Sequence, residues 1–246
     1  MQKILGVEFM SCDVVEVVDR MMAGGLLTVP SAPALREIGT NLGYREALLN
    51  SDVVIADSAY MVLIWRLLHW RPIRRISGLL YIREFLKRAE PRNAQNTFWI
   101  MAGPVSAQRN LAYLRSEGIE VPADCVYVAP FYGKEIRDED LLSALRRVRP
   151  KHVVVTLGGG TQERVGLYIK RNLDYLPGIH CIGAAIAFLS GDQVAIPDWA
   201  DRLYLGWLFR CISKPRAYIP RYWNSIGLIG LMMRYGTELP PVEKDN

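Results

Sequence analysis

Short apolar runs rich in β-branched residues recur along the chain, and stretches with helical periodicity separate most of them. The runs occupy residues 4–7, 26–29, 53–56, 97–101, 125–129, 152–157 and 179–185. Strands that are apolar on both faces and alternate with helices are typical of a parallel sheet covered on both sides. Residues 1–197 therefore predict one doubly wound, mostly parallel, Rossmann-like α/β domain. In such domains ligands bind beyond the carboxyl ends of the strands.

Three of the intervening stretches carry clear helix signals. Residues 13–22 place valines and a methionine at helical spacing, and residues 106–117 end at Gly118, a residue that commonly terminates helices. Residues 138–147 begin with acidic and end with basic side chains, as the helix dipole prefers. The Asp-Glu-Asp triplet at 138–140 superficially matches a metal-holding DxD motif, but acids are expected in a first helical turn. We interpret this triplet as structural.

The pattern changes after Pro197. Residues 199–212 have helical periodicity, and residues 214–235 are interrupted by Pro215 and Pro220, with no further strand. Residues 198–236 therefore predict a helical appendage that associates with membranes. Residues 237–246 combine prolines and charges and predict a disordered tail.

The positive charge is concentrated in two segments. The chain of 246 residues carries a net charge of +5, but residues 66–92 alone carry +6 and residues 198–234 carry +4. Local basicity indicates anionic partners at two places. The second segment also contains seven Trp, Tyr and Phe residues, a combination found in single-stranded nucleic-acid sites and at membrane interfaces. A solvated helix face is the alternative for either segment.

Several classes of protein are disfavoured. At 50% apolar and 22% charged residues the composition is that of a globular protein. The four cysteines form no CxxC pair and the three histidines no HxxxH-type pair, which argues against a disulfide framework, a structural zinc site and metal-dependent hydrolysis. No signal peptide is visible and no window approaches the roughly 20 apolar residues of a membrane span. These features predict a cytoplasmic protein.

The strongest local motif is the strand-to-helix junction at residues 156–163, TLGGGTQE. A glycine-rich turn allows backbone N–H groups to approach a phosphate, and the helix N-terminus adds a favourable dipole. Gly158 and Gly160 fit a GxGxxG pattern, but Glu163 replaces its third glycine. A dinucleotide site is therefore disfavoured, whereas a nucleotide diphosphate site stays open. The alternative is a tight turn capped by Thr161.

Two further junctions place polar groups where strands are expected to end. Asp57 follows the run at 53–56 and could act as a general base, or could cap the next helix. Thr28 and Ser31 follow the run at 26–29 and offer two hydroxyl groups to a ligand. The alternative is that these hydroxyls only cap the helix that follows.

An ordered set of motifs resembles one enzyme family, the WecG/TagA/CpsF glycosyltransferases, from about residue 4 to residue 234. The motifs are TVPS at 28–31, DS at 57–58, RISG at 75–78, GGGTQE at 158–163, WLFR at 207–210, PR at 215–216 and RY at 221–222. The resemblance implies transfer of a sugar from a UDP-sugar to a polyprenyl-diphosphate-linked sugar, with inversion and without a metal or other cofactor. It also implies a role in bacterial cell-envelope or exopolysaccharide synthesis.

The resemblance assigns roles to individual residues. Asp57 matches the aspartate proposed as the catalytic base. The residues implied in substrate binding are Thr28, Ser31, Ser58, Arg75, Ser77 and Gly78. Those implied in nucleotide binding are Gly158, Gly159, Gly160, Thr161, Gln162 and Glu163. Those implied in binding the diphosphate or lipid are Arg210, Arg216 and Arg221. Ser31, Ser58, Thr161 and Gly206 stand where the family usually has asparagine, glycine, proline and an acid.

The expected protein is thus a glycosyltransferase attached peripherally to the inner face of the cell membrane. A nicotinamide-dependent oxidoreductase and a non-catalytic nucleic-acid-binding protein are the alternatives. The donor sugar, the acceptor sugar and the formation of a homo-oligomer stay open at this stage.

Overall fold

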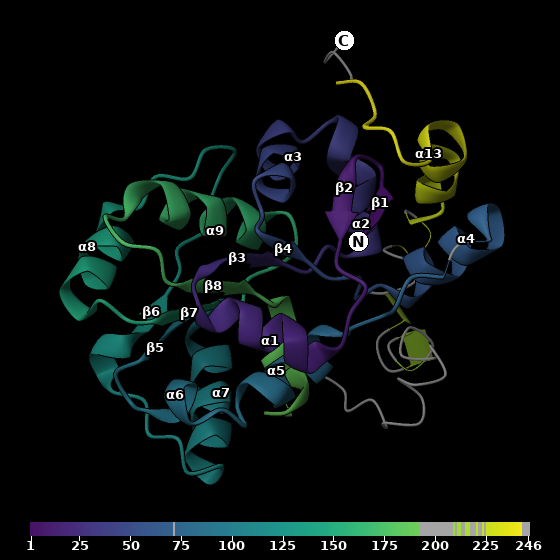
Figure 1. Cartoon of the computed structure of the whole chain (residues 1–246). Helices are drawn as coiled ribbons and strands as arrows, with labels where there is room; N and C mark the ends of the chain where they lie inside the picture. Colours follow the sequence, from purple (N-terminus) through teal and green to yellow (C-terminus); the bar gives the residue numbers. More distant parts are fainter. Residues whose placement is uncertain are drawn as a thin grey trace.

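A computed structural model describes residues 1–70, 72–191, 209, 211–212, 215–216, 220, 223 and 225–242 (Figure 1). The strands are β1 (Gln2–Ile4), β2 (Val7–Phe9), β3 (Gly25–Thr28), β4 (Val53–Val54), β5 (Thr97–Met101), β6 (Val126–Val128), β7 (His152–Val155) and β8 (Gly178–Cys181). The α-helices are α1 (Val14–Met22), α2 (Ala32–Leu35), α3 (Leu42–Leu49), α4 (Ala59–His69), α5 (Gly78–Phe85), α6 (Ala89–Arg92), α7 (Pro104–Ser116), α8 (Glu139–Val148), α9 (Thr161–Asn172) and α13 (Gly227–Tyr235). Short 3₁₀ helices are η1 (Arg36–Gly39), η2 (Ala123–Cys125) and η3 (Gly183–Phe188).

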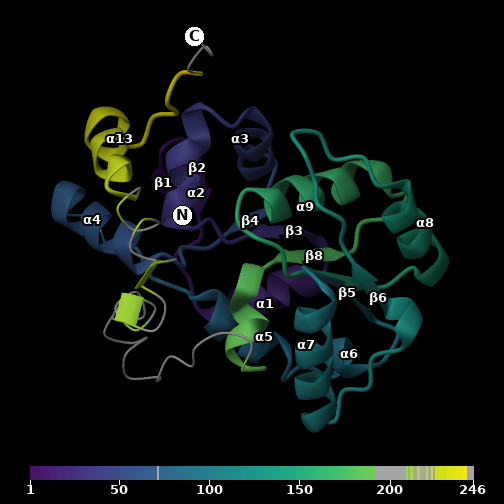
Figure 2. The same cartoon turned by 180° about the vertical axis from the view of Figure 1, so that it is seen from behind.

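Six strands form one parallel sheet in the order β4-β3-β8-β7-β5-β6. The four inner strands β3, β8, β7 and β5 are buried along their whole length, because helices cover both faces. Helices α1, α5 and α7 pack on one face, whereas α3, α8 and α9 pack on the other (Figures 1 and 2). The expected doubly wound α/β architecture is therefore confirmed.

The helix signals at residues 13–22, 106–117 and 138–147 are confirmed by α1, α7 and α8. Asp13 caps α1 by accepting a hydrogen bond from the Val15 amide, and Asp138 caps α8 in the same way through the Leu141 amide. Asp138 also accepts hydrogen bonds from the hydroxyls of Tyr127 and Tyr132. These contacts bear out the structural interpretation of the acidic triplet.

The prediction of a sheet strand at residues 4–7 is wrong. Leu5 and Gly6 have φ angles of 48° and 80° and form the turn of a separate two-stranded antiparallel hairpin, β1-β2. Two consecutive positive φ angles are characteristic of tight hairpin turns. Met10, which follows the hairpin, forms a parallel β-bridge with Ile55, which follows β4, and β2 packs beside β4.

A second hydrophobic core lies beyond the β4 edge of the sheet. The hairpin, α2, α3, α4 and α13 enclose it, and Figures 1 and 2 both show α13 beside α4. Leu228 and Met232 of α13 are fully buried in this core. Part of the segment 198–236, which was expected to associate with membranes, therefore packs against the protein itself.

Residues 237–246 were expected to form a disordered tail. The structure describes residues 237–242 of this segment, and they contact the rest of the protein. The amides of Leu5 and Gly6 donate hydrogen bonds to the carbonyls of Gly236 and Thr237. Arg45 donates a hydrogen bond of 2.5 Å to the carbonyl of Pro240. These bonds satisfy backbone groups that a disordered tail would leave to water. Residues 243–246 lie outside the described part of the chain.

Candidate active site

A cavity of about 390 Å³ opens beyond the carboxyl edge of the six-stranded sheet. Residues that follow five different strands line it: Ser31 after β3, Asp57 after β4, Ala102 after β5, Gly158 and Gly159 after β7, and Ile182 with η3 after β8. The parallel arrangement brings these distant segments to one edge, which is where ligands bind in doubly wound sheets.

Asp57 is held in the cavity by the N-terminus of α5. Its Oδ1 atom accepts a hydrogen bond of 3.1 Å from the Gly78 amide, and Nη2 of Arg75 lies 4.0 Å away. Arg75 is anchored in turn, because its Nε donates to the Asp57 carbonyl at 2.7 Å. The other carboxylate oxygen of Asp57 accepts no hydrogen bond from a described residue, and the side chain is 34% exposed. Asp57 therefore lines the cavity with one carboxylate oxygen that no described residue binds.

The alternative that Asp57 caps the following helix is wrong. Ser58 caps α4, because its hydroxyl accepts a hydrogen bond from the Met61 amide at 3.2 Å. Ser77 caps α5 through the Leu80 amide and also lines the cavity, as do Arg75 and Gly78. Ser58 is absent from the cavity lining of the described residues.

The glycine-rich turn lies across the cavity mouth at the start of α9. A Cβ atom on Gly158 would have open space around it, whereas one on Gly159 would lie 3.2 Å from Oγ of Ser31. Ser31 occupies the N-cap position of α2 but makes no capping hydrogen bond, and its buried hydroxyl has no hydrogen-bond partner among the described residues. The turn and Ser31 therefore present backbone amide and hydroxyl groups to the same space.

The Gln-Glu pair after the turn connects two segments that line the cavity. Gln162 lines the cavity, and its Oε1 accepts a hydrogen bond from the Gly183 amide at the start of η3. Glu163 is fully buried and accepts hydrogen bonds from the Gly160 amide at 2.7 Å and from Nε2 of Gln162 at 3.1 Å. Burial raises the pKa of the Glu163 carboxyl to about 7. The pair thus joins the glycine-rich turn to η3, and Glu163 itself stays out of the cavity.

Thr28 also lies away from the cavity. It is fully buried, and its hydroxyl donates a hydrogen bond of 3.0 Å to Oγ of Ser51. Ser51 follows α3 and donates in turn to the Ala47 carbonyl. This chain fixes β3 against α3. Gly160, with φ of 87°, and Thr161 begin α9 behind the lining residues.

The structure adds lining residues that the sequence predictions missed. Ser106 and Asn110 of α7 line the cavity, and Asn110 is 1% exposed and accepts a hydrogen bond from Ser190 at 2.6 Å. Asn110 occupies a buried position of α7 between Ala107 and Leu114. A polar residue at an apolar helical position is the signal that could have identified it.

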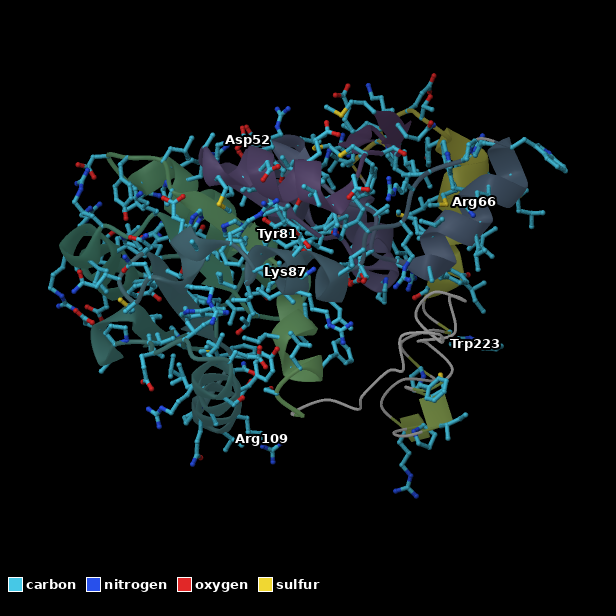
Figure 3. All side chains as sticks on the ribbon, turned by 60° about the horizontal axis from the view of Figure 1, so that its bottom comes forward. Asp52, Arg66, Tyr81, Lys87, Arg109 and Trp223 are labelled. Carbon is cyan, nitrogen blue, oxygen red and sulfur yellow. The ribbon has the colours of Figure 1, made fainter. Side chains whose placement is uncertain are left out.

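A buried polar chain lies under α5, within the interior where Figure 3 shows Tyr81. The Tyr81 hydroxyl lies 2.7 Å from Nδ1 of His180, and Nε2 of His180 lies 3.2 Å from Nδ1 of His152. Burial lowers the pKa of His152 to about 4 and holds the pKa of His180 well below its ordinary value. Within the described residues, no group of three or more His, Cys, Asp or Glu side chains is arranged to hold a metal ion.

The structure describes one of the three C-terminal arginines that the sequence predicts to bind diphosphate or lipid. Arg216 is exposed, whereas Arg210 and Arg221 lie outside the described residues. Every helix in the described ranges is too short or too polar to traverse a lipid bilayer.

Comparison with known proteins identifies this arrangement. Residues 2–240 match the glycosyl transferase WecG/TagA/CpsF family. The chain is also 24% identical over 211 residues to a Bacillus subtilis protein, N-acetylglucosaminyldiphosphoundecaprenol N-acetyl-β-D-mannosaminyltransferase. The similar region covers 82% of this chain and 78% of that relative. The match over nearly the whole chain favours a glycosyltransferase over the oxidoreductase and nucleic-acid-binding alternatives, and the chain belongs to the WecG/TagA/CpsF glycosyltransferase family.

Proposed function

We propose that the protein is an inverting glycosyltransferase that moves a sugar from a UDP-sugar to a polyprenyl-diphosphate-linked sugar. The observation that carries this proposal is the position of Asp57, which lines a cavity together with the glycine-rich turn and has one carboxylate oxygen that no described residue binds. The named relative acts on an acceptor of this class, an N-acetylglucosaminyl-diphospho-lipid. The product would serve the assembly of a bacterial cell-envelope polysaccharide or an exopolysaccharide.

Asp57 is proposed as the general base. Attack on the donor requires removal of a proton from the acceptor hydroxyl, and a carboxylate within hydrogen-bond reach performs this step. Gly78 and Arg75 fix the carboxylate from one side and leave the other oxygen to the acceptor. The side chain is therefore oriented before the acceptor arrives, which lowers the entropic cost of the reaction.

A single displacement with inversion is consistent with the charged groups around the cavity. Asp57 is the one acidic side chain among the described lining residues. If Asp57 is the base, retention through a glycosyl-enzyme intermediate would require a further carboxyl group as nucleophile. Glu163 is unsuited to that role, since it is fully buried and its oxygens bind Gly160 and Gln162.

The leaving UDP is proposed to bind at residues 158–163. Gly158 and Gly159 expose backbone at the cavity, and α9 begins directly behind them, so its N-terminal dipole favours the negative charge of the diphosphate. Arg210, Arg216 and Arg221 are proposed to reach the donor or acceptor diphosphate, because the guanidinium group binds phosphate oxygens in a bidentate manner. This set of groups would stabilise the leaving group without a metal ion.

The C-terminal segment is proposed to hold the enzyme at the membrane surface. Residues 198–234 combine a net charge of +4 with several aromatic residues, and Trp223 is 73% exposed. Each basic residue close to an anionic leaflet contributes about 1 kcal/mol of binding free energy. Attachment would therefore be peripheral and reversible, on the cytoplasmic side where lipid-diphosphate acceptors are used.

A transfer assay tests the proposal directly. The purified chain is incubated with a panel of UDP-sugars and a short-chain prenyl-diphosphate N-acetylglucosamine, and the product is followed by mass spectrometry. Nuclear magnetic resonance of the new glycosidic bond then gives its anomeric configuration. We expect transfer from at least one UDP-sugar with inversion. Retained configuration, or transfer that requires a divalent cation, would contradict the proposed mechanism.

A further inference from the structure

Helix α4 connects the cavity to an exposed apolar stripe. Its N-cap, Ser58, directly follows Asp57, and its C-cap, Trp70, lies at the outer end of the helix. Four side chains at helical spacing form the exposed face: Leu63, Arg66, Leu67 and Trp70. We call this set the α4 stripe.

The stripe is unusually apolar for an exposed surface. Leu63 is 47% exposed, Leu67 is 73% exposed and Trp70 is 88% exposed. These residues recur at intervals of four and three, so they follow one line along the helix. A contiguous apolar line of this kind marks an interaction surface more often than scattered single residues do.

The opposite face of α4 keeps the stripe in place. Met61, Val62, Ile64 and Trp65 are buried in the second core, with Trp65 at 0% exposure. The Trp65 and His69 rings pack with their centroids 4.0 Å apart. The stripe is therefore carried on a packed element whose N-terminal end directly follows Asp57.

The charge around the stripe is entirely positive in sequence. Residues 58–83 contain five arginines and no acidic residue. Arg74 and Arg75 interact with Asp13 and Asp57, whereas Arg66 lies on the stripe itself, where its Nη2 also donates to the Ile73 carbonyl. Figure 3 shows Arg66 on the outer part of α4, far from Arg109 of α7.

We propose that the α4 stripe lies on the anionic surface of a lipid bilayer. Leucines and a tryptophan beside an arginine on one helix face are the composition of helices that lie in the membrane interface. An acid-free arginine-rich segment is complementary to anionic headgroups. The stripe thus forms a docking surface separate from the C-terminal segment.

This orientation also places the base where the acceptor emerges. Because the stripe runs along α4, the helix would lie along the bilayer, and a helix is only about 10 Å across. Asp57, at the N-terminal end of α4, would then stay close to the headgroup level at which a lipid diphosphate is exposed. This part of the inference rests on the proposed function, whereas the docking surface itself does not.

Vesicle sedimentation of the full chain tests the surface. The vesicles are phosphatidylcholine alone and an equimolar mixture of phosphatidylcholine and phosphatidylglycerol. We expect Leu63→Gln/Leu67→Gln to weaken partitioning by about tenfold or more, because less apolar area enters the interface. Arg66→Gln should weaken binding to the mixed vesicles about fivefold and leave binding to phosphatidylcholine unchanged.

A matched control uses two exposed leucines on another helix. Leu42 and Leu49 of α3 are 55% and 45% exposed, so Leu42→Gln/Leu49→Gln removes the same groups from a different face. We expect this control to bind vesicles as the unmodified chain does. Thermal unfolding of both double variants verifies that they are folded.

The outcomes separate the surface from the activity. Unchanged partitioning of Leu63→Gln/Leu67→Gln, or no vesicle binding by the unmodified chain, overturns the proposal. A dimer of the unmodified chain that the same variant converts to monomers also overturns it, since a second copy would then cover the stripe. Loss of transfer to a bilayer-borne acceptor, with transfer to a short soluble acceptor retained, supports it. If the unmodified chain transfers no sugar yet binds vesicles through the stripe, the proposed function fails and the surface stands.

Discussion

Individual side chains at the cavity differ sharply in what they contribute. Asp57 is partly exposed and has one carboxylate oxygen without a described hydrogen-bond donor, whereas Glu163 is fully buried with both oxygens bound. The two carboxyl groups therefore suit different tasks. The first is available for proton transfer, and the second holds the backbone that surrounds the cavity.

Replacing Asp57 tests the proposed base at the residue scale. Asp57→Asn should lower turnover by about 100-fold or more, because the amide cannot accept the acceptor proton. The affinity for UDP should change little, since the amide retains the size and the oxygen that faces Gly78. Steady-state kinetics and calorimetric titration of UDP measure the two effects. Asp140→Asn, an exposed carboxylate of α8, is the control, and equal turnover of the two variants would reject Asp57 as the base.

Glu163 is expected to make stability depend on pH. Burial raises its pKa from 4.5 to about 7, so between these values the unfolded chain releases a proton that the folded chain keeps. The free energy of unfolding should therefore fall as the pH rises through this window, by on the order of 3 kcal/mol.

Comparison with Glu163→Gln isolates that contribution. The depressed pKa of His152, about 4, acts in the opposite direction, because the free energy of unfolding then rises with pH up to the ordinary histidine range. Both proteins share the histidine effect, so it cancels in the difference. Denaturant unfolding at pH 5 and pH 8 should show the unmodified chain losing stability relative to the variant. Parallel pH profiles would show that Glu163 is ionised across the whole range.

Elements rather than single residues determine how closely a ligand approaches the sheet edge. The turn before α9 leaves open space at Gly158, and Gly158 does not have a positive φ angle. A side chain at position 158 would therefore meet no other part of the described protein and would occupy space in the cavity.

The Gly158→Val variant tests the proposed UDP site. We expect UDP affinity to fall at least about tenfold, because the isopropyl group would keep the diphosphate from the backbone amides. Calorimetric titration measures the affinity. Gly133→Val, at a second glycine with open space around it, and Asp138→Ala in the structural triplet are the controls. UDP binding that is lost in Asp138→Ala and depends on a divalent cation would move the nucleotide site to α8.

The sequence predicts most elements of the fold because their signals are local. Six of the seven expected strands form the sheet, and the acid-to-base polarity of residues 138–147 correctly indicates α8. The run at 4–7 was wrongly predicted as a sheet strand, because its residues are mostly apolar although the backbone turns at Leu5 and Gly6. Similarly, the run at 179–185 continues past β8 into η3, where Gly183 adopts a φ angle of 60°. An apolar run indicates that its residues are buried, but buried residues can belong to a strand or to a turn.

The cavity was less predictable than the strands. Asp57, Ser31 and Gly158 could be placed because each directly follows a strand in the sequence. Asn110 and Gly183 reach the same space through strand order and helix packing, which depend on contacts between distant segments. Thr28 shows the converse, because it ends a strand but its side chain faces α3.

At the scale of the whole molecule, the C-terminal helix completes the second core. Leu228 and Met232 are fully buried against residues of the hairpin, α2 and α4, whereas the adjacent Met233 is 68% exposed. One helix therefore carries both a structural face and a solvent-exposed face.

Substitutions on the two faces of α13 should have unequal effects. Leu228→Ala or Met232→Ala should lower the free energy of unfolding by about 2–5 kcal/mol, because each leaves a cavity in a closed core. Met233→Ala, with the same loss of atoms as Met232→Ala, should change it by less than about 0.5 kcal/mol. Urea unfolding measures all three variants. Equal losses for Met232→Ala and Met233→Ala would show that α13 does not pack as described.

The bonds from Leu5 and Gly6 to Gly236 and Thr237 also constrain how the chain is made. A ribosome releases the hairpin long before its partner segment, because the two are far apart along the chain. Until residues 226–239 emerge, the apolar faces of the hairpin and α4 lack part of their cover, and exposed surface of this kind promotes aggregation of nascent chains. Helix α4, which begins right after Asp57, gains one of its packing partners only when α13 has docked. Premature termination before residue 226 would therefore yield a chain that leaves part of the second core exposed and depends on chaperones.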